Sequence, residues 1–527
     1  MIKLTEKQHE AVFTRNCDLL VSAAAGSGKT AVLSERILQE ITDKENLAEI
    51  TEFLIVTFTN AAAAEMKDRI GKKILEASAD ESLEPEIKKH LKKQLSLMSK
   101  ASINTIHSFC LDIIRNNFHF LDIDPNVRVA DKNEIEILKM QVAEDMMEQM
   151  FAEEGTLFFE IIKWLGGGHD ELFIEKILEI YRFINGFPKP LYWLNEKVEE
   201  YNPANINSSA ESWIEAAKKI AEEEIIYLIF QAKDLCKKLI DNGIYSYQET
   251  VEEDIIVLES YLSKLKNKNK GSLKSSISFP KLKQRPKDAD EFLCKKYQKQ
   301  REEIKKKAQE IVLTLNFSEE DLLFQTEKIY PRLKCVEKSI IVFDKLFKEC
   351  KKTLSIIDFS DFEHLALEIL SDKSNGVAKA LGEKFREIMV DEYQDCNQTQ
   401  ELIFSYISRK VNGVSANMFM VGDIKQSIYR FRLADPDIFA DKNRNYLAEG
   451  LQKKIVLNKN FRSSATIIDG INSVFENIMT EDFGGIDYSN DEKLYFRAET
   501  KNKNSEEKCE FALINKDSSD KGEADYI

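Results

Sequence analysis

Long apolar runs are missing from this 527-residue sequence. The first residues, MIKLTEKQHE, contain no apolar signal core, and no later stretch approaches the ~20 apolar residues that a membrane-spanning helix needs. The eight cysteines are scattered and include no Cys-x-x-Cys pair. Scattered cysteines are typical of reduced thiols, and they argue against a disulfide framework and against a zinc or iron–sulfur site. These absences predict a cytoplasmic protein with no membrane partner.

Glycine, proline and net positive charge are also scarce. The chain has 19 Gly and 9 Pro, and its 43% apolar and 31% charged residues match a soluble globular protein. The chain is long enough for about three domains. Its net charge of −16 argues against a general nucleic-acid coat protein.

One segment departs from this acidic balance. Residues 264–307 contain sixteen Lys or Arg and only five Asp or Glu. Such a segment is either a solvated, partly irregular helical surface or a surface that follows the phosphates of a nucleic acid. The sequence alone leaves both interpretations open.

Six short apolar runs are typical of buried parallel strands. Two of them lead directly into helix-like stretches at 29–40 and 61–75. This repetition of strand, loop and helix predicts an α/β motor-type fold that binds ligands at the carboxyl ends of its strands. The six runs are 18–23, 53–59, 101–106, 387–392, 417–423 and 453–458.

A long segment between these runs has a different character. From about Ile106 to Asp358, Glu, Lys, Leu and Ile recur at helical spacing, as in residues 212–240. We therefore predict a mostly helical insertion, with a loop or linker at 266–288. Residues 509–527 are expected to form a strand, a polar turn and the start of a helix.

The first strand is followed by a candidate phosphate-binding loop, AAAGSGKT. The usual template, Gly-x-x-x-x-Gly-Lys-Ser/Thr, has a glycine where Ala23 stands. Gly26 and Gly28 allow the backbone to approach an anion, Lys29 supplies a positive charge, and Thr30 supplies a hydroxyl for Mg²⁺. The alternative is a glycine-rich turn without a ligand. The loop alone does not separate a motor from a kinase or a GTPase.

An acidic pair follows a later strand, in IMVDEYQD. Asp391 is placed to hold the Mg²⁺ shell, usually through water, and Glu392 to orient or deprotonate an attacking water. That second role would favour a hydrolase over a phosphoryl transferase. The alternative is an acidic pair that caps a helix.

Seven segments together resemble the superfamily 1 DNA helicases of the UvrD/Rep type. They occur in the same order as in that family, which often has Ala at the position of Ala23. The long helical insertion is most similar to that of the A subunits of bacterial AddAB-type helicase–nucleases. The same holds for two sequence segments, SAAAGSGKTAVLSERI (22–37) and FRLADPDIF (431–439). The segments are LTEKQHEAV (4–12), AAAGSGKT (23–30), TFTNAAAAEM (57–66), TIHSFC (105–110), DEYQD (391–395), VGDIKQSIYRFRLADPDIF (421–439) and NKNFRSS (458–464).

The resemblance implies a role for each matched position at the nucleotide. Gln8 would read the adenine edge, and Phe461 would stack on the ring where relatives often carry Tyr. Gln426 would sense the γ-phosphate and couple it to DNA, and Arg462 would reach the γ-phosphate as an arginine finger. The implied catalytic residues are Lys29, Asp391, Glu392, Gln426 and Arg462. The implied nucleotide-binding residues are Gln8, Ala23, Ala24, Ala25, Gly26, Ser27, Gly28, Lys29, Thr30 and Phe461, with Thr30 and Asp391 at the metal.

Candidate DNA contacts also have a physical basis. Single strands are gripped by aromatic stacking and by a groove that follows the backbone. Several aromatic and hydroxyl side chains follow the predicted strands, although each aromatic taken alone fits core packing as well. The candidates are Thr57, Phe58, Thr59, Asn60, His107, Tyr429 and Phe431.

The resemblance also implies a domain order. Residues 1–106 and 358–446 would form a first RecA-like motor domain, 107–357 a helical insertion domain, and 447–527 the beginning of a second RecA-like domain. The later helicase motifs and the nuclease domain of the family have no counterpart before Ile527. We therefore expect an N-terminal portion that binds ATP, lacks the nuclease site and does not unwind DNA alone.

The activity implied is ATP-driven 3′-to-5′ movement on single-stranded DNA. It would serve homologous recombination and the repair of double-strand breaks. The cofactors implied are ATP and Mg²⁺, and the partners implied are an AddB-like second subunit, single-stranded DNA and duplex ends. Two other classes stay open: a non-catalytic ATP- and DNA-binding scaffold module, and an unrelated phosphate-loop enzyme such as a kinase. The residues Glu392, Gln426 and Arg462 argue against the kinase.

Overall fold

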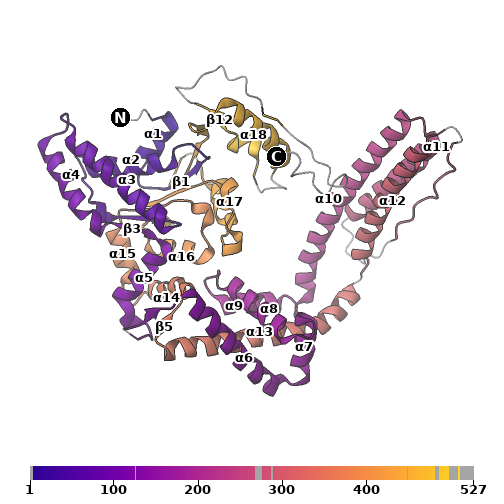
Figure 1. Ribbon diagram of the computed structural model, residues 1–527, viewed down its shortest axis with the longest axis horizontal. Helices are drawn as coiled ribbons and strands as arrows, with labels where there is room; N and C mark the ends of the chain where they lie inside the picture. Colours follow the sequence, from indigo (N-terminus) through magenta and orange to yellow (C-terminus); the bar gives the residue numbers. More distant parts are fainter. Residues whose placement is uncertain are drawn as a thin grey trace. The chain divides into compact units, whose positions relative to one another are not determined.

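The chain divides into two compact units. Unit 1 comprises Met1–Val142, Glu179–Pro190 and Leu346–Ile527, and unit 2 comprises Ala143–Leu178 and Leu191–Lys345. The structure is a computed structural model (Figure 1). It describes residues 4–124, 126–266, 276–286, 289–317, 319–411, 413–447, 449–480, 486–497 and 509–510.

Unit 1 is built on a six-stranded sheet whose paired strands all run parallel. Its strand order is β10-β1-β9-β6-β2-β3. Parallel strands bring their carboxyl ends to one edge, so the loops after β1, β9 and β6 lie next to one another. The bounds are β1 Asp18–Ala23, β2 Phe53–Thr57, β3 Ser102–Thr105, β6 Glu387–Val390, β9 Met418–Gly422 and β10 Gln452–Leu457.

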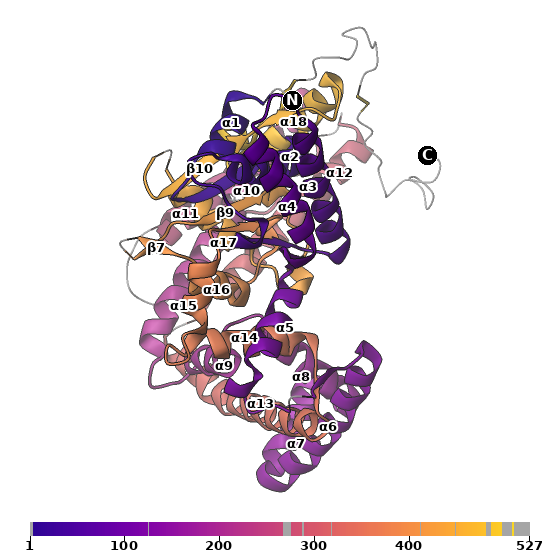
Figure 2. The same ribbon diagram turned by 90° about the vertical axis from the view of Figure 1, so that its left-hand side faces the viewer.

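Helices cover both faces of this sheet because successive strand residues point to opposite sides. In β1, Leu19 and Val21 pack into one core and Leu20 into the other. Figures 1 and 2 show α3 and α4 side by side. The first core contains α1 Glu6–Phe13, α2 Lys29–Thr42, α3 Asn60–Ala79 and α4 Pro85–Leu97. The second contains α5 Ile106–Asn117, α14 Phe359–Ser371, α15 Val377–Lys384, α16 Gln398–Ile407 and α17 Pro436–Asn445.

The predicted α/β fold class is confirmed, and each of the six predicted strands forms. Strand β10 lies within residues 447–527, which were predicted to begin a second domain. β10 pairs with β1 along its whole length, and Ile455 and Leu457 enter the first core. A short apolar strand beside an exposed sheet edge is buried by pairing there. The predicted domain boundaries stay predictions.

The predicted helical insertion has its own core in unit 2. Helices α10 Ile206–Asp241, α11 Tyr245–Lys266 and α12 Glu291–Thr314 pack together through one apolar cluster. Within the predicted loop, residues 276–286 form no helix or strand, and 267–275 and 287–288 lie outside the described residues. Further helices of the insertion are α6 Lys132–Glu154, α7 Thr156–Gly166, α8 Asp170–Ile184, α9 Pro190–Glu199 and α13 Glu319–Thr353.

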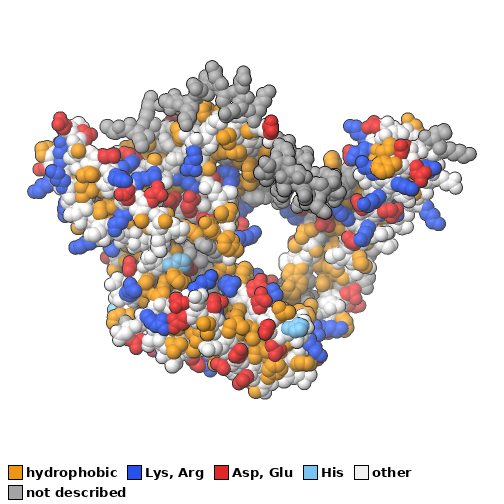
Figure 3. Space-filling model, viewed as in Figure 1, with side chains coloured by type: hydrophobic (Ala, Val, Ile, Leu, Met, Phe, Trp, Pro, Cys, Tyr) orange, Lys and Arg blue, Asp and Glu red, His pale blue; other side chains and the backbone are white. Residues whose placement is uncertain are grey.

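Several cations of the basic segment 264–307 pair with carboxylates. Lys283 Nζ lies 2.6 Å from Glu249, and Arg301 is buried against Asp254 with an Nε–Oδ2 distance of 2.6 Å. Figure 3 shows Lys and Arg interspersed with Asp and Glu over the helices α10–α12. The segment is therefore not a uniformly basic surface.

Short elements follow β10. Strand β11 Lys459–Asn460 pairs in parallel with β12 Tyr495–Phe496, and α18 Ala465–Ile478 lies between them in sequence. The strand, turn and helix expected at 509–527 lie outside the described residues, apart from residues 509–510.

Candidate functional site

The loop between β1 and α2 has the backbone that a bound anion requires. Gly26 and Gly28 have φ angles of +71° and +89°, which L-residues with side chains rarely adopt. A Cβ at Gly26 would lie 2.9 Å from Asn460 Nδ2, and one at Gly28 would lie 3.1 Å from Gln8 Nε2. Ser27 Oγ is buried and has no hydrogen-bond partner in the described structure. This close-packed loop therefore holds a hydroxyl that still lacks a partner.

The first residue of α2 meets the acidic pair that follows β6. Lys29 Nζ donates to Glu392 Oε2 at 2.8 Å and to Oε1 at 3.1 Å. Glu392 has a φ of +52°, in the left-handed region. A non-glycine residue there costs of order 1–3 kcal/mol, and such strain clusters at functional sites. The ion pair joins two segments that the sequence predicts to act together.

Two carboxyl groups beside this pair have pKa values raised above the ordinary value for aspartate. Burial, with the Glu392 charge, raises the pKa of Asp391 to about 6. The same two causes, burial first, raise the pKa of Asp395 to about 7. Asp395 Oδ1 is buried without a hydrogen-bond partner in the described structure. Both groups would release protons more readily if a cation entered the site.

Gln394 connects this acidic loop to β9. Its Nε2 donates to Glu392 Oε2 at 3.0 Å, and its Oε1 accepts from the Asp423 backbone N–H at 2.9 Å. A Cβ at Gly422 would overlap Gln394 Oε1, so only glycine leaves room for this contact. Asp423 Oδ2 in turn accepts from Gln426 Nε2 at 2.8 Å. A continuous chain of contacts thus runs from Lys29 to Gln426.

A buried ion pair continues the chain beyond β9. Lys425 Nζ lies 2.8 Å from Asp423 Oδ1 and also pairs with Glu492. Glu492 Oε1 accepts from Ser22 Oγ, on β1, at 3.0 Å. The segment before β12 is therefore anchored to the strand that precedes the phosphate loop.

The segment after β10 docks onto the phosphate loop through one buried side chain. Asn460 Nδ2 donates to the Ala25 carbonyl at 2.8 Å. Its Oδ1 accepts from the Arg462 and Ser463 backbone N–H groups, both at 2.8 Å. Arg462 is exposed beside Gly26. Asn460 therefore positions Arg462 next to the loop.

Gln8 and Phe461 line the same small cavity. Its volume is about 20 Å³, and Thr5, Ser27 and Leu457 are also part of its wall. Gln8 Nε2 donates to the Ser27 carbonyl at 2.9 Å, and the Phe461 N–H donates to the Gly26 carbonyl at 3.0 Å. The space suffices for about one water molecule, so a purine ring would enter only if Phe461 moved.

Three of the candidate DNA-binding aromatics come together. Phe58 and Tyr429 stack with ring centroids 4.6 Å apart, and Phe431, 73% exposed, lies 5.9 Å from Tyr429. His107 belongs to another cluster, where Nε2 lies 3.3 Å from Glu363 Oε1.

The hydroxyl and amide candidates lie beside Phe58. Thr57 Oγ1 donates to the Thr59 carbonyl at 3.1 Å. Thr59 caps α3 by accepting from the Ala62 N–H at 3.1 Å, and Asn60 is the first residue of that helix. Thr59 and Asn60 are exposed and Thr57 is buried. The two exposed residues can therefore face a ligand from the start of α3.

Sequence reasoning missed several polar residues of this site. Gln394, Asp423, Lys425 and Asn460 all fall inside segments whose neighbours were predicted. The sequence could have identified them by their position, because each is a polar residue that directly follows a buried strand or lies beside a candidate site residue. Glu492 carries no such signal, because its contact with Ser22 joins residues 470 positions apart.

The described residues fit a nucleoside triphosphate with a divalent cation. The glycine backbone and the unpaired Ser27 hydroxyl suit a phosphate, and Lys29 supplies a cation for it. Thr30, in the first turn of α2, and the buried carboxyl of Asp391 supply oxygen ligands of the kind that Mg²⁺ prefers.

Comparison with known proteins agrees with this geometry. Residues 4–447 match the model of the UvrD/REP helicase N-terminal domain. The A subunit of the ATP-dependent helicase/nuclease of Clostridium acetobutylicum is 40% identical over 520 residues, which cover 93% of this chain and 41% of that protein. Its counterpart in Clostridium botulinum strain Kyoto is 37% identical over 559 residues, covering 98% of this chain and 43% of that protein. The chain thus spans about two fifths of the length of these curated relatives.

All eight cysteines carry free thiols. Among the helices that the structure describes, none combines the length and the apolar character needed to cross a membrane.

Proposed function

Because this chain belongs to the UvrD/Rep helicase family, we propose that it binds and hydrolyses ATP to drive movement along DNA. The observation that carries the proposal is the Lys29–Glu392 ion pair at the carboxyl edge of the sheet, with Gln394 and Asp423 behind it. A structural ion pair alone would not need a strained left-handed glutamate beside a glycine-rich loop. The same pair also brings together the two residue types that a phosphate-loop hydrolase uses.

The ion pair suggests how the site responds to a triphosphate. In the structure, Lys29 neutralises Glu392. Phosphate oxygens would compete for Lys29 and release the Glu392 carboxylate, which Gln394 still holds in place. Glu392 would then accept a proton from an attacking water. Thr30 and Asp391 would hold a divalent cation, which supplies charge neutralisation for the phosphates.

The second part of the proposal concerns DNA. The stacked rings of Phe58 and Tyr429, with the exposed Phe431, offer a stacking platform for unpaired bases. Gln426 precedes Tyr429 by three residues and is hydrogen-bonded to Asp423. Nucleotide-dependent changes at Glu392 would therefore reach the DNA-binding residues through Gln394, Asp423 and Gln426.

The finer assignments rest on similarity to the A subunits of the helicase/nucleases. We propose 3′-to-5′ movement on single-stranded DNA, assembly with an AddB-like second subunit, and a role in recombinational repair of double-strand breaks. These roles imply a cytoplasmic location. The catalytic and nucleotide-binding residues are proposed to be those that the family resemblance implies, with Arg462 as the arginine finger.

The first experiment is ATP hydrolysis by the 527-residue chain with and without single-stranded DNA. Lys29→Ala and Glu392→Gln should each reduce turnover by at least about 100-fold, because removal of one such group typically costs that much. Glu392→Gln should still bind ATP. The matched control is Lys44→Ala, which removes an exposed lysine whose Nζ lies 2.7 Å from Glu84.

The outcomes separate the candidate functions. DNA-stimulated turnover that Lys29→Ala abolishes and Lys44→Ala leaves intact supports the motor. ATP binding that depends on Lys29, without turnover, would favour a non-catalytic ATP- and DNA-binding module. Binding that is the same in all variants would refute the site.

A further inference from the structure

Helix α2 and strand β6 are joined a second time, far from the nucleotide site. We propose that the buried pair Arg36–Glu387 is a positioning device: it fixes the register of α2 against β6 and thereby the separation of Lys29 and Glu392. The inference rests on the proposed function, because Lys29 and Glu392 are its reacting ends.

Three ion pairs link the two elements in order. Lys29 pairs with Glu392 at the carboxyl edge of the sheet. Arg36 pairs with Glu387, the first residue of β6. Glu40 Oε2 lies 2.6 Å from Nε of Arg386, the residue before β6. Because α2 runs opposite to β6, the order 29, 36, 40 on the helix meets 392, 387, 386 on the strand segment.

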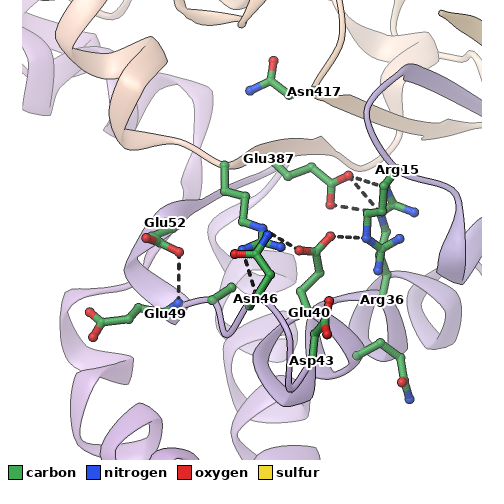
Figure 4. Close-up of polar contacts among 12 residues, drawn as sticks. Arg15, Arg36, Glu40, Asp43, Asn46, Glu49, Glu52, Glu387 and Asn417 are labelled. Carbon is green, nitrogen blue, oxygen red and sulfur yellow. Dashed lines mark hydrogen bonds and ion pairs between the residues drawn. The ribbon is translucent and has the colours of Figure 1, made fainter.

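The central pair is the most deeply buried. Arg36 is 1% exposed and Glu387 is 5% exposed. Arg36 Nε lies 3.0 Å from Glu387 Oε1 and 2.9 Å from Oε2, and Nη2 also contacts Oε1. Figure 4 shows Arg15, Arg36, Glu40 and Glu387 converging at this edge. Such a two-pronged contact fixes orientation as well as distance.

Arg36 also contacts two further elements that lead to the site. Nη1 donates to the Ala11 carbonyl at 2.7 Å, on α1, the helix that carries Gln8. The guanidinium lies 4.5 Å from the ring centroid of Phe419, on β9, the strand that ends just before Asp423. One side chain therefore contacts α1, β6 and β9 from α2. Each of these four elements carries a residue of the nucleotide site or is closely followed by one. These residues are Gln8 on α1, Lys29 on α2, Glu392 after β6 and Asp423 after β9.

Helix geometry makes this contact informative about Lys29. Seven residues are about two turns, so Lys29 and Arg36 lie on one face of α2. A slip of α2 by one residue would move Lys29 by about 1.5 Å along the helix axis. A misplacement of this size costs catalytic sites up to about 100-fold.

A buried ion pair is a poor source of stability, since desolvation offsets most of its attraction. Its best-attested use is to specify register. That use fits a site in which Lys29 must exchange Glu392 for phosphate. While the pair at the site opens, Arg36–Glu387 would keep the helix and the strand aligned.

The test measures affinity for a fluorescent ATP analogue with Mg²⁺, alongside the melting temperature, in the 527-residue chain. Arg36→Met with Glu387→Met removes both charges and leaves none unpaired, so the fold should persist. We expect the double variant to melt close to the wild type and to bind the analogue about tenfold or more weakly. Arg36→Lys, which keeps the charge and loses the two-pronged contact, should weaken binding in the same direction.

The matched control removes another ion pair of α2. Glu35 Oε2 lies 2.6 Å from Lys73 Nζ on α3, and neither residue leads to the site. Glu35→Met with Lys73→Met should leave affinity unchanged. Wild-type affinity in the Arg36 variants, loss of fold in both of them, or equal weakening by the control would overturn the positioning role. Failure of the wild type to bind the analogue would refute the proposed function itself.

Discussion

At the scale of single residues, the acidic loop after β6 contains groups that lower the stability of the folded chain. Glu392 occupies the left-handed region, and Asp391 and Asp395 are carboxyl groups in surroundings that favour their neutral forms. Such groups are retained where their charge is needed for binding or chemistry. The strain therefore supports the assignment of this loop to the site, and it makes a prediction about pH.

Asp395→Asn should stabilise the chain increasingly as pH rises. Burial raises the folded-state pKa of Asp395 from 3.8 to about 7. The folded state then binds more protons than the unfolded state between these values, so this group lowers stability progressively from pH 4 to pH 7 in the wild type. Asparagine has no such titration. Denaturation midpoints of variant and wild type at pH 5, 6, 7 and 8 should diverge, with the variant higher at pH 8.

Asp372→Asn is the control for this pH series. Hydrogen bonds from Ser374 lower the pKa of Asp372 below 3.8. Its contribution to stability is therefore constant above pH 4 and is lost only as pH falls below that value. The difference between Asp372→Asn and wild type should be flat from pH 5 to pH 8. A flat difference for Asp395→Asn as well would contradict the raised pKa.

At the scale of elements, the strands and the phosphate loop were predictable and the connections between them were not. Buried parallel strands are nearly continuous apolar runs, which the sequence displays directly. Contacts such as Glu387 with Arg36 join residues 351 positions apart and have no local pattern. The same holds for Asn460, which lies in a recognised segment but acts on the Ala25 carbonyl, 435 positions away.

β10 illustrates the limit of prediction from a local sequence pattern. Its short apolar run predicts a buried strand, but a local run does not tell which sheet will accept that strand. Pairing with β1 decides the question, since Asp18 through Ala23 meet Gln452 through Leu457 in register. As a result, the segment that carries Arg462 begins directly beside the phosphate loop.

Asn460→Ala should loosen the contact between the segment that carries Arg462 and the phosphate loop. The substitution leaves the Ala25 carbonyl and the Arg462 and Ser463 N–H groups without their partner. Unsatisfied buried groups cost about 1–3 kcal/mol each, so we expect a loss of roughly 2–3 kcal/mol in stability where water compensates in part. Nucleotide affinity should fall with it. Chemical denaturation and titration with a fluorescent ATP analogue measure the two effects.

Asn477→Ala provides the comparison for Asn460→Ala. Asn477 is exposed on α18 and donates to the Ser473 carbonyl at 2.6 Å. Its loss should change neither stability nor affinity appreciably. Equal effects of the two substitutions would mean that Asn460 does not couple the segment to the loop.

At the scale of the whole molecule, charge is distributed unevenly along the sequence. The chain is acidic overall, with a net charge of −16, yet residues 264–307 in unit 2 are basic. Acidic surfaces repel DNA, so a nucleic-acid partner would be guided to the basic parts. The pairs Lys283–Glu249 and Arg285–Glu291 show that part of this charge is already neutralised.

Reversal of Lys281, Lys283 and Arg285 to Glu should weaken binding to duplex DNA and flatten its salt dependence. If all three contact phosphates, the slope of log affinity against log salt should fall by up to about 0.9 per contact. Existing carboxylate pairs should reduce that change for Lys283 and Arg285.

A matched control reverses Lys219, Lys233 and Lys238, which are exposed on α10 and pair with carboxylates in the same way. Equal weakening by both sets would indicate general repulsion by added negative charge. A selective effect of the first set would identify 281–285 as a phosphate-tracking surface, and no effect of either would identify it as a solvated one.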